Sequence, residues 1–380
     1  MSARVDWLCE KLGECSMKIT KIVITGGPGA GKTNAMTWVR DAFTKLGYTV
    51  IFVPETATEL ISGGVAPWTC GTNLDYQKCQ MRMQLFKEDI FEQGARTMDA
   101  KKLLLVCDRG SMDNRCYMTD GEFQQLLAEL GTTETALRDR YDAVFHLVTA
   151  AKGAKAHYTL ENNRARIETE AQAIELDDRG IAAWTGHPHF RVIGNREVFD
   201  DKMQDLIDEI MSFLGEPEPL EIERKFLIEY PDLAYMASLP NCRKVDIRQT
   251  YLRERNDEHV RVRARGEAGS YTYFKTTKRT LTDTTRIEVE QRLTEEEYNA
   301  LLQDADPERR PIEKTRWCLT WDEQYFEIDV FPFWDDKAFL EIELRSEADE
   351  VRLPPWIKVI REVTGDRRYN NSSLAKELPE

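Results

Sequence analysis

The chain contains 380 residues, more than one compact core usually holds, so we expect two domains. Its 67 Asp and Glu outnumber its 52 Lys and Arg and leave a net charge of −15 at pH 7. A hydrophobic content of 41% excludes a disordered or collagen-like chain. Nucleic acid and anionic lipid surfaces repel such a chain, so we expect no nucleic-acid partner and a defined pocket for any polyanionic ligand.

The cysteines and the lack of long apolar runs indicate a cytoplasmic protein. The eight cysteines form no Cys-x-x-Cys pair, which favours reduced thiols over a zinc site or a disulfide framework. Residues 1–17 mix charged with apolar side chains and do not resemble a signal peptide. No apolar run is long enough to span a membrane, so we predict no transmembrane segment.

The first half of the chain alternates short apolar runs with helical patterns. Because the runs are almost continuously apolar, they predict parallel strands that are covered by helices on both faces. This domain is therefore predicted to be α/β, with a parallel sheet. The expected strands lie at 22–24, 50–53, 103–106 and 143–148, and the expected helices at 34–46 and 76–98.

A short linker separates this domain from a second one with a different period. Residues 215–219 read Gly-Glu-Pro-Glu-Pro, and two prolines with a glycine are typical of a linker. After residue 220 the hydrophobic period changes from 3.6 to 2, apart from a helical segment at 294–303. We predict a first domain at 1–214 and an antiparallel sheet or barrel at 220–380.

A phosphate-binding loop follows the first expected strand and opens the first expected helix. Residues 26–33 read GGPGAGKT and fit GxxxxGK[ST] at every fixed position. Backbone N–H groups and the helix N-terminus bind phosphate, Lys32 reaches the terminal phosphates, and Thr33 ligates Mg²⁺. The alternative is a glycine-rich turn without a ligand. The predicted nucleotide-binding residues are Gly26, Gly27, Pro28, Gly29, Ala30, Gly31, Lys32 and Thr33.

Two carboxylates are predicted to act beside this loop. Asp108 ends the apolar run at 103–107, and open α/β sheets bind ligands at the carboxyl ends of their strands, so we expect it to be a second magnesium ligand. Its alternative role is a helix N-cap. Glu55 follows the strand that ends at Val53 and is predicted to orient or deprotonate an acceptor hydroxyl. Its alternative role is a first-turn helix glutamate.

Three arginines are predicted to neutralise charge on a transferring phosphoryl group: Arg109, Arg164 and Arg166. The last two lie in a polar stretch at 161–175, so solvated arginines are the alternative there. No Asn-Lys-x-Asp tetrapeptide follows the loop, which does not support a Ras-like GTPase. The spacing favours a small-molecule kinase or an ATPase, and leaves ATP and GTP open as ligands.

Like charges recur two residues apart along the expected strands of the second domain. Side chains two apart share one face of a strand, so Glu221, Glu223 and Lys225 lie together, as do Arg261 and Arg263. A solvated face is the ordinary explanation, but it favours mixed signs. Acidic pairs suit a divalent cation and basic pairs suit phosphates, so we predict a closed sheet with its charges inward.

This interpretation assigns roles to a set of charged residues. Lys225 and Lys275 are also assigned to catalysis, together with Glu55, Asp108, Arg109, Arg164 and Arg166. The predicted phosphate-binding residues are Lys225, Arg261, Arg263, Lys275, Arg286, Lys314 and Arg316. The predicted metal ligands are Glu221, Glu223, Glu288, Glu290, Asp329, Glu341 and Glu343 in the second domain, with Thr33 and Asp108 in the first.

The second half resembles CYTH domains, the triphosphate tunnel metalloenzymes. Residues 221–225, EIERK, are similar to their ExExK signature, and residues 362–369 resemble their C-terminal segment. The likeness covers nearly all of 220–377. It implies an antiparallel eight-stranded tunnel that binds inorganic polyphosphates, nucleoside triphosphates or phosphorylated small molecules with Mg²⁺ or Mn²⁺.

The first half resembles the AAA-type P-loop domain of NadR-type ribosylnicotinamide kinases and of the TRPL-translocation-defect family. The likeness rests on the P-loop and on residues 53–57, 107–110 and 186–190. The order of the two domains is also similar to the latter family. That resemblance implies binding of GTP and of phosphoinositide head groups in membrane-protein trafficking.

Two functions are consistent with these patterns. The first is an enzyme with a P-loop kinase or NTPase domain that uses ATP or GTP, and a metal-dependent triphosphatase in the tunnel. The second is a nucleotide-switched adaptor whose tunnel captures a phosphoinositide head group with little turnover. The sequence does not specify the acceptor, the metal, the oligomeric state or any coupling between the domains.

Overall fold

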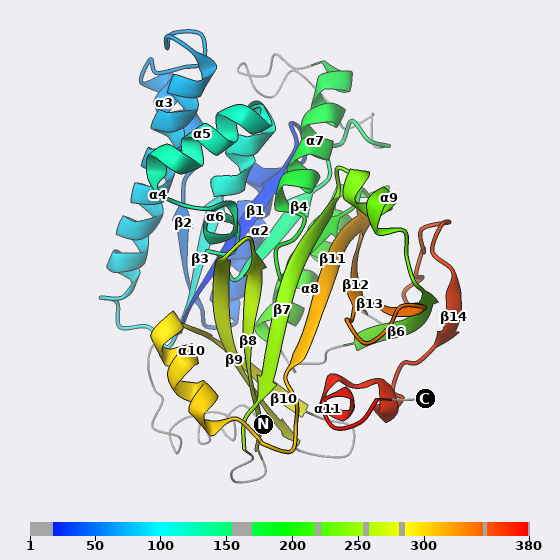
Figure 1. The fold of residues 1–380 in the computed structure, drawn as a ribbon. Helices are drawn as coiled ribbons and strands as arrows, with labels where there is room; N and C mark the ends of the chain where they lie inside the picture. The colour runs from blue at the N-terminus through cyan, green and yellow to red at the C-terminus, as the bar shows by residue number, and fades with distance from the viewer. Residues whose placement is uncertain are drawn as a thin grey trace.

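The computed structural model describes residues 18–153, 169–216, 222–253, 258–280, 286–344 and 348–378 (Figure 1). Two sheets organise these residues, one in each half of the chain. No helix among them is both long and apolar enough to cross a membrane.

The first domain is built on a five-stranded sheet whose paired strands are all parallel. The strand order is β2-β3-β1-β4-β5, so the P-loop strand β1 lies in the centre and β5 at an edge. This confirms the predicted parallel sheet. The strands are β1 (Lys18–Gly26), β2 (Thr49–Val53), β3 (Lys102–Asp108), β4 (Ala143–Leu147) and β5 (Phe190–Ile193).

Helices cover both faces of this sheet, which explains why its strands are continuously apolar. Alternate residues of β1 enter different cores, since Val23 packs in one apolar cluster and Ile22 and Ile24 in another. Two expected helices are confirmed within three residues, as α2 and α4. The helices are α2 (Lys32–Lys45), α3 (Thr56–Ser62), α4 (Asn73–Ala95), η1 (Ser111–Tyr117), α5 (Asp120–Leu130), α6 (Glu134–Arg138), α7 (Glu170–Trp184) and α8 (Phe199–Leu214).

The second domain is an antiparallel sheet with the order β10-β9-β8-β7-β11-β12-β13-β6-β14. The antiparallel tunnel-type fold is confirmed; nine strands occur in the described residues where eight were expected, and the four-residue β14 lies at one end. The strands are β6 (Ile222–Glu229), β7 (Cys242–Tyr251), β8 (Glu258–Glu267), β9 (Ser270–Thr280), β10 (Arg286–Leu293), β11 (Ile312–Trp321), β12 (Gln324–Val330), β13 (Lys337–Leu344) and β14 (Val359–Glu362).

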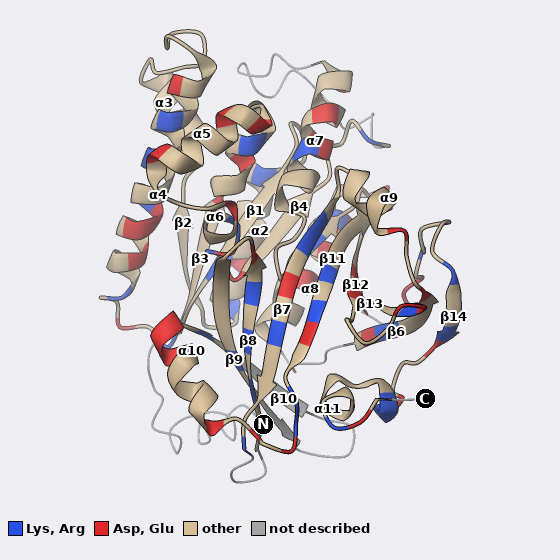
Figure 2. Ribbon diagram, in the orientation of Figure 1, with Lys and Arg blue, Asp and Glu red and all other residues tan. Residues whose placement is uncertain are grey.

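Short helices and loops cover the apolar side of this sheet. Tyr298 of α10 packs with Val262, and Met236 of α9 packs with Ile328. Charged and uncharged residues alternate along β7 and β11, as the blue and red segments of these strands show (Figure 2). The helical elements are α9 (Leu233–Ser238), α10 (Glu295–Leu301), η3 (Leu302–Asp304), η4 (Arg367–Tyr369) and α11 (Asn371–Leu374).

The two domains share one apolar cluster. Val245, Ile247 and Tyr325 of the second sheet pack with Trp184 and Phe190 of the first domain. The rings of Tyr325 and Phe190 meet edge to face with their centroids 5.7 Å apart. Since the contact is apolar and continuous with the core of the first domain, the domains are packed together and not merely tethered by the linker.

Candidate functional site

The P-loop follows β1 and leads into the N-terminus of α2. Gly26 has a φ of 147° and lies against the carbonyl oxygen of Leu147, so a Cβ atom would collide there. Nζ of Lys32 donates hydrogen bonds to the carbonyl oxygens of Gly26 (3.1 Å) and Gly27 (3.4 Å). A helix N-terminus and a lysine therefore meet at a glycine turn, which is an arrangement that suits phosphate.

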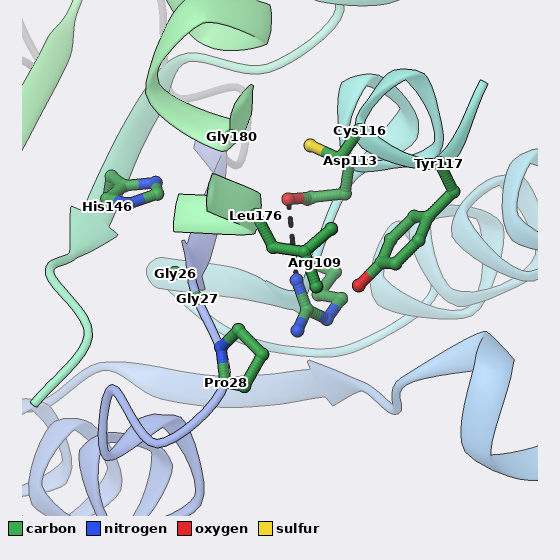
Figure 3. A pocket seen from close by; sticks show the side chains of 10 residues that line it. All are labelled: Gly26, Gly27, Pro28, Arg109, Asp113, Cys116, Tyr117, His146, Leu176 and Gly180. Carbon is green, nitrogen blue, oxygen red and sulfur yellow. Dashed lines mark ion pairs between the residues drawn. The ribbon is translucent and has the colours of Figure 1, made fainter. Parts of the chain in front are cut away.

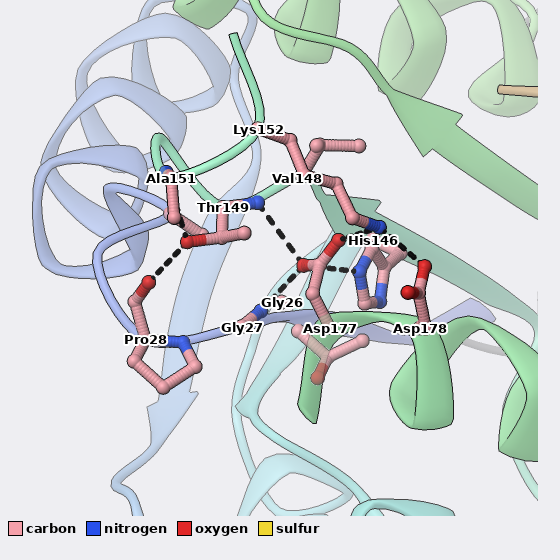
Figure 4. A network of polar contacts seen from close by, with 12 residues as sticks. Gly26, Gly27, Pro28, His146, Val148, Thr149, Ala151, Lys152, Asp177 and Asp178 are labelled. Carbon is pink, nitrogen blue, oxygen red and sulfur yellow. Dashed lines mark hydrogen bonds and ion pairs between the residues drawn. The ribbon is translucent and has the colours of Figure 1, made fainter. Parts of the chain in front are cut away.

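Asp177, on the buried face of α7, anchors the first turn of the P-loop (Figure 4). Its Oδ1 accepts hydrogen bonds from the backbone N–H groups of Gly27 and Thr149, both at 3.0 Å, and lies 3.0 Å from Nε2 of His146. Its Oδ2 accepts from Nζ of Lys152 at 2.9 Å. Burial opposes ionisation, but His146 and Lys152 outweigh it and hold the pKa of Asp177 well below its usual range.

The predicted site residues did not include Asp177, although helical spacing carried a signal. Asp177 lies four residues from both Ala173 and Ile181, and all three are buried on α7. A carboxylate in the middle of an apolar helix face needs a partner in the interior. The P-loop supplies that partner.

Arg109 lies beside the P-loop and pairs with Asp113 (Figure 3). It also pairs with Glu55. Its Nε donates to Oε1 of Glu55 at 2.7 Å, and its Nη1 lies 3.7 Å from Oδ1 of Asp113. Asp113 also accepts from the backbone N–H of Gly110 at 2.7 Å and from the hydroxyl of Thr25. Arg109 has a φ of 66°, which is strained for a residue other than glycine. These contacts hold its guanidinium in one place.

The electrostatics separate the roles of the residues near the loop. Burial, with help from Arg109, lowers the pKa of Lys32 to about 8. Burial raises the pKa of Glu55, but Arg109 and Lys32 outweigh it and bring that pKa down to about 2. A carboxylate with so low a pKa is a weak base, so the geometry favours orientation over deprotonation as the role of Glu55.

Asp108 has the features of a metal ligand. It ends β3, and its buried Oδ1 has no hydrogen-bond partner among the described residues. Burial raises the pKa of Asp108, while nearby Lys32 lowers it. An orphaned carboxylate oxygen near the P-loop lysine fits a Mg²⁺ ion that Thr33 would also ligate. Arg164 and Arg166 lie outside the described residues.

A cavity of about 930 Å³ lies against the charged face of the second sheet. Among the described residues, nine Lys or Arg and five Glu line it, so cations outnumber carboxylates by four in a chain of net charge −15. Such a cavity suits a polyanion. The charged lining residues are Arg191, Glu223, Lys225, Arg261, Arg263, Arg265, Glu290, Arg309, Lys314, Arg316, Glu327, Glu341, Glu343 and Arg367.

Asp329 orders the cations in the floor of this cavity. It is fully buried, and its Oδ1 accepts from Nε of Arg316 at 2.7 Å. Its Oδ2 accepts from Nη2 of Arg316 at 2.7 Å and from Nζ of Lys314. Burial opposes ionisation, but Arg316 and Lys314 outweigh it and keep the pKa of Asp329 well below its usual range. Both oxygens of Asp329 therefore position cations, and its role as a metal ligand stays a prediction.

Glu341 is occupied in the same way. Its Oε1 lies 2.6 Å from Nζ of Lys225, and its Oε2 accepts from Nη2 of Arg316 at 2.9 Å. Burial raises the pKa of Glu341, but Lys225 outweighs it and the pKa is lowered. The structure therefore places Glu341 among the cations as a positioning group, and its role as a metal ligand stays a prediction.

Two glutamates face each other at another part of the cavity. Glu223 of β6 and Glu343 of β13 are paired across the two strands and both line the cavity. Opposed like charges are unfavourable unless a cation compensates them. Among the described residues no three His, Cys, Asp or Glu side chains cluster as a metal site. Mg²⁺, however, is often bound by one or two carboxylates plus substrate phosphates, and these two glutamates fit that use.

Strand register places Lys275 on the wrong face for the predicted role. Lys275 of β9 pairs with Val262, which is buried in the apolar cluster under α10, whereas Arg261 pairs with Thr276. Paired residues share a face of the sheet, so Lys275 lies opposite Arg261. Lys275 does not line the cavity, and its assignment to phosphate binding and catalysis is corrected.

The other predicted tunnel residues divide into two groups. Arg261, Arg263 and Glu290 line the cavity, and Nη2 of Arg263 donates to Oε2 of Glu290 at 2.8 Å. Nε of Arg263 is buried without a hydrogen-bond partner among the described residues. Burial opposes ionisation of Glu290, but Arg263 outweighs it and holds its pKa well below the usual range. Glu221, and the side chains of Arg286 and Glu288, lie outside the described part.

Five basic lining residues were not predicted. Arg309 and Arg367 lie outside the strands, and Arg265 extends the pattern of Arg261 and Arg263 by two residues. That spacing was a readable signal for Arg265. His189 and Arg191 come from the first domain, and nothing in the strand pattern of the second domain indicates them.

Comparisons with known proteins agree with this architecture. The AAA domain model matches residues 21–202, and the CYTH domain model matches residues 219–358. An inorganic triphosphatase of Acetivibrio thermocellus is 35% identical over 160 residues, which cover 41% of this chain and 93% of the relative. An inorganic triphosphatase of Nitrosomonas europaea is 35% identical over 165 residues, which cover 42% of this chain and 99% of the relative.

The crystal structure of an inorganic triphosphatase is also similar to this chain, with 32% sequence identity and a TM-score of 0.30. The match covers 42% of this chain and 97% of the chain in that structure.

The fold and the site define a two-domain protein in which a P-loop α/β domain precedes a charged antiparallel tunnel sheet. The chain belongs to the CYTH family, with an AAA domain fused ahead of its CYTH domain.

Proposed function

We propose that the CYTH domain hydrolyses a triphosphate in its cavity and that the AAA domain binds ATP or GTP at the P-loop. The observation that carries the proposal is the excess of cations over carboxylates along the cavity of an acidic chain. The similarity to two inorganic triphosphatases supports the same substrate class. The reaction is cleavage of a phosphoanhydride bond by water.

The cations of the cavity would bind the phosphates and stabilise charge that develops on them. Lys314 and Arg316 are held by Asp329, and Lys225 is held by Glu341, so their charges are fixed before the substrate arrives. Fixed charges need little reorganisation during the reaction and so stabilise its transition state well. Arg261 and Arg263 extend this row along β8.

Glu223 and Glu343 would hold Mg²⁺ or Mn²⁺ together with phosphate oxygens. The ion would neutralise phosphate charge and lower the pKa of a bound water. Glu221 and Glu288 remain predicted ligands. In the AAA domain, Lys32 would bind the terminal phosphates, and Thr33 and Asp108 would hold a second Mg²⁺.

Capture of a phosphoinositide head group is a second candidate for the cavity. Asn370, Asn371, Ser372 and Ser373 line it beside the cations, and Oδ1 of Asn371 is buried without a hydrogen-bond partner among the described residues. Neutral polar groups suit hydroxyls of an inositol ring or of a ribose. Tight binding of an inositol phosphate without triphosphate hydrolysis would favour this adaptor function.

The test measures phosphate release from tripolyphosphate, ATP and GTP by the full chain with Mg²⁺ or Mn²⁺. Glu223→Gln keeps the size of the side chain and removes its charge, so tripolyphosphate hydrolysis should fall by about two orders of magnitude. Lys32→Ala should abolish nucleotide binding at the P-loop and leave tripolyphosphate hydrolysis intact. The opposite pattern, with activity lost in Lys32→Ala and kept in Glu223→Gln, would place the reaction in the AAA domain.

A further inference from the structure

The cavity of the CYTH domain is not lined by that domain alone. Pro188, His189 and Arg191 of the AAA domain form part of its wall. They lie in the segment 186–191, which leads from α7 into the edge strand β5. This segment includes the Gly-His-Pro-His-Phe stretch noted in the sequence, and it takes no part in the P-loop site.

The turn before β5 is fixed by hydrogen bonds on both sides of the domain junction. His187 is fully buried, its Nε2 lies 3.0 Å from the carbonyl oxygen of Tyr141, and its Nδ1 accepts from the backbone N–H of His189 at 3.0 Å. Burial lowers the pKa of His187 to about 3, so the ring is neutral with its proton on Nε2. The hydroxyl of Tyr325, in the CYTH domain, donates to the carbonyl oxygen of His187 at 2.9 Å.

Strand alternation then directs Arg191 into the cavity. Phe190 is fully buried in the shared apolar cluster, so Arg191 lies on the other side of β5. Its Nη1 donates to the carbonyl oxygen of Phe190 at 3.0 Å, and its Nη2 donates to Oε2 of Glu343 across the junction. Nε lies 3.6 Å from Oε2 of Glu209 on α8. Hydrogen bonds within the described residues thus use two of the five N–H donors, and Nε faces Glu209, which leaves one donor on each Nη for a ligand.

The charge of Arg191 matters because of what surrounds it. Glu223 and Glu343 oppose each other on the neighbouring strands, and Arg191 provides the cation that Glu343 contacts. Arg191 therefore adds a fixed positive charge beside the two proposed metal ligands. A guanidinium binds phosphate through parallel N–H donors, which an ammonium group cannot match.

We propose that the AAA domain completes the polyphosphate site of the CYTH cavity, with Arg191 as a phosphate ligand and specificity residue. This inference rests on the proposed function, because it assumes that the cavity takes a linear polyphosphate. The binding site is then a property of the fused chain. The two domains are joined by a shared substrate contact as well as by packing.

Binding and hydrolysis of tripolyphosphate by full-length variants test this inference. Calorimetric binding is measured in a Lys32→Ala background, so that the P-loop does not contribute. Arg191→Ala should weaken the Kd, and raise KM in the hydrolysis assay, by about 10- to 100-fold, the scale of a hydrogen bond to a charged group. Arg191→Lys should recover part of the loss, because it restores the charge and not the fork of donors.

Two controls separate phosphate binding from a structural effect. Arg196→Ala removes another arginine of the same domain, one that pairs with Asp205 and does not line the cavity, and should leave Kd and KM unchanged. Glu209→Gln removes the α8 partner of Arg191 and should change Kd less than twofold. The melting temperature of Arg191→Ala should stay near that of the wild type. If it falls, the Kd and KM of Arg191→Lys are compared with those of the wild type instead, because this variant keeps the positive charge and the fold.

The outcomes distinguish this inference from the proposed function. If the wild type hydrolyses tripolyphosphate and the Kd and KM of Arg191→Ala lie within twofold of the wild-type values, the inference is overturned and the proposed function is supported. Wild-type binding without hydrolysis would overturn the function, while the Kd of Arg191→Ala still judges the inference. Absence of tripolyphosphate binding in the wild type would overturn both.

Discussion

Nη1 of Arg265 in the CYTH domain lies 2.8 Å from Oδ2 of Asp139 in the AAA domain, and the two side chains are 2% and 0% exposed. Asp139 also pairs with Arg138 at 2.7 Å, and Arg265 donates to the carbonyl oxygen of Gly186. The junction between the domains therefore contains a buried, fully partnered ionic group. Such groups are costly to break from one side only.

The Arg265→Met variant should be less stable by about 3 kcal/mol, the lower end for removing one partner of a buried ion pair, because Asp139 keeps Arg138. Urea unfolding of the full chain measures the change. Arg352→Ala is the matched control, since its pair with Asp322 is exposed and should contribute less than about 1 kcal/mol. Equal effects of the two variants would contradict a buried role for Arg265.

Acid should weaken the same junction. Burial raises the pKa of Asp139, but Arg138 and Arg265 outweigh it and lower the pKa from its ordinary 3.8 to about 2. A depressed carboxyl pKa stabilises the folded state above the unfolded pKa, and that contribution is lost as the pH falls. We expect stability on the order of 2 kcal/mol to disappear between about pH 4 and pH 2.

Other carboxylates titrate in this range, so the measurement is a comparison. The free energy of unfolding is followed from pH 7 to pH 2 in the wild type and in Asp139→Asn. Asp139→Asn should be less stable than the wild type at pH 7, and the difference in their free energies of unfolding should become smaller below about pH 4. A constant gap across that range would exclude Asp139 as the titrating group.

Removing the P-loop anchor should affect both nucleotide affinity and stability. In Asp177→Ala the N–H groups of Gly27 and Thr149 lose their acceptor, and His146 and Lys152 lose their partner. We expect a loss of stability of about 3 kcal/mol and a weaker Kd for ATP or GTP. Asp178→Ala is the control, because Asp178 is 63% exposed and contacts only Lys152 among the described residues.

Because Lys275 of β9 lies on the face of the sheet away from the cavity, its substitution tests which residues of the second domain bind the substrate. Lys275→Ala should keep tripolyphosphate hydrolysis within twofold of the wild type, because Lys275 lies on the face that Val262 shares. Lys314→Ala should lower kcat/KM at least about tenfold, since Lys314 lines the cavity and is fixed by Asp329. Loss of tripolyphosphate hydrolysis in Lys275→Ala would contradict this face assignment and support the predicted role of Lys275 in the site.

The two-domain fold was predictable because its signals are periodic. Val260 and Val262 alternate with Arg261 and Arg263, and this alternation is enough to assign one charged and one apolar face to β8. The error at Lys275 has a physical reason: a strand shows which residues share a face, but only its register against a neighbour shows which face that is.

The residues that were missed depend on tertiary contacts. Arg191 is one of two arginines near β5, and nothing in its own strand distinguishes it from the exposed Arg196. Its place in the cavity follows from the packing of Phe190 against Tyr325, some 130 residues away along the chain. Asp177 differs, because its position on an apolar helix face was visible in the sequence.

The shared apolar cluster has a consequence for synthesis on the ribosome. Trp184 and Phe190 emerge long before Val245, Ile247 and Tyr325, the residues that cover them. At roughly 5–20 residues per second, the roughly 140 residues from Trp184 to Tyr325 take about 7–28 s to translate. During that interval the nascent AAA domain exposes the apolar side chains of Trp184 and Phe190. We expect chaperones to bind this surface until the CYTH domain has been synthesised and covers it.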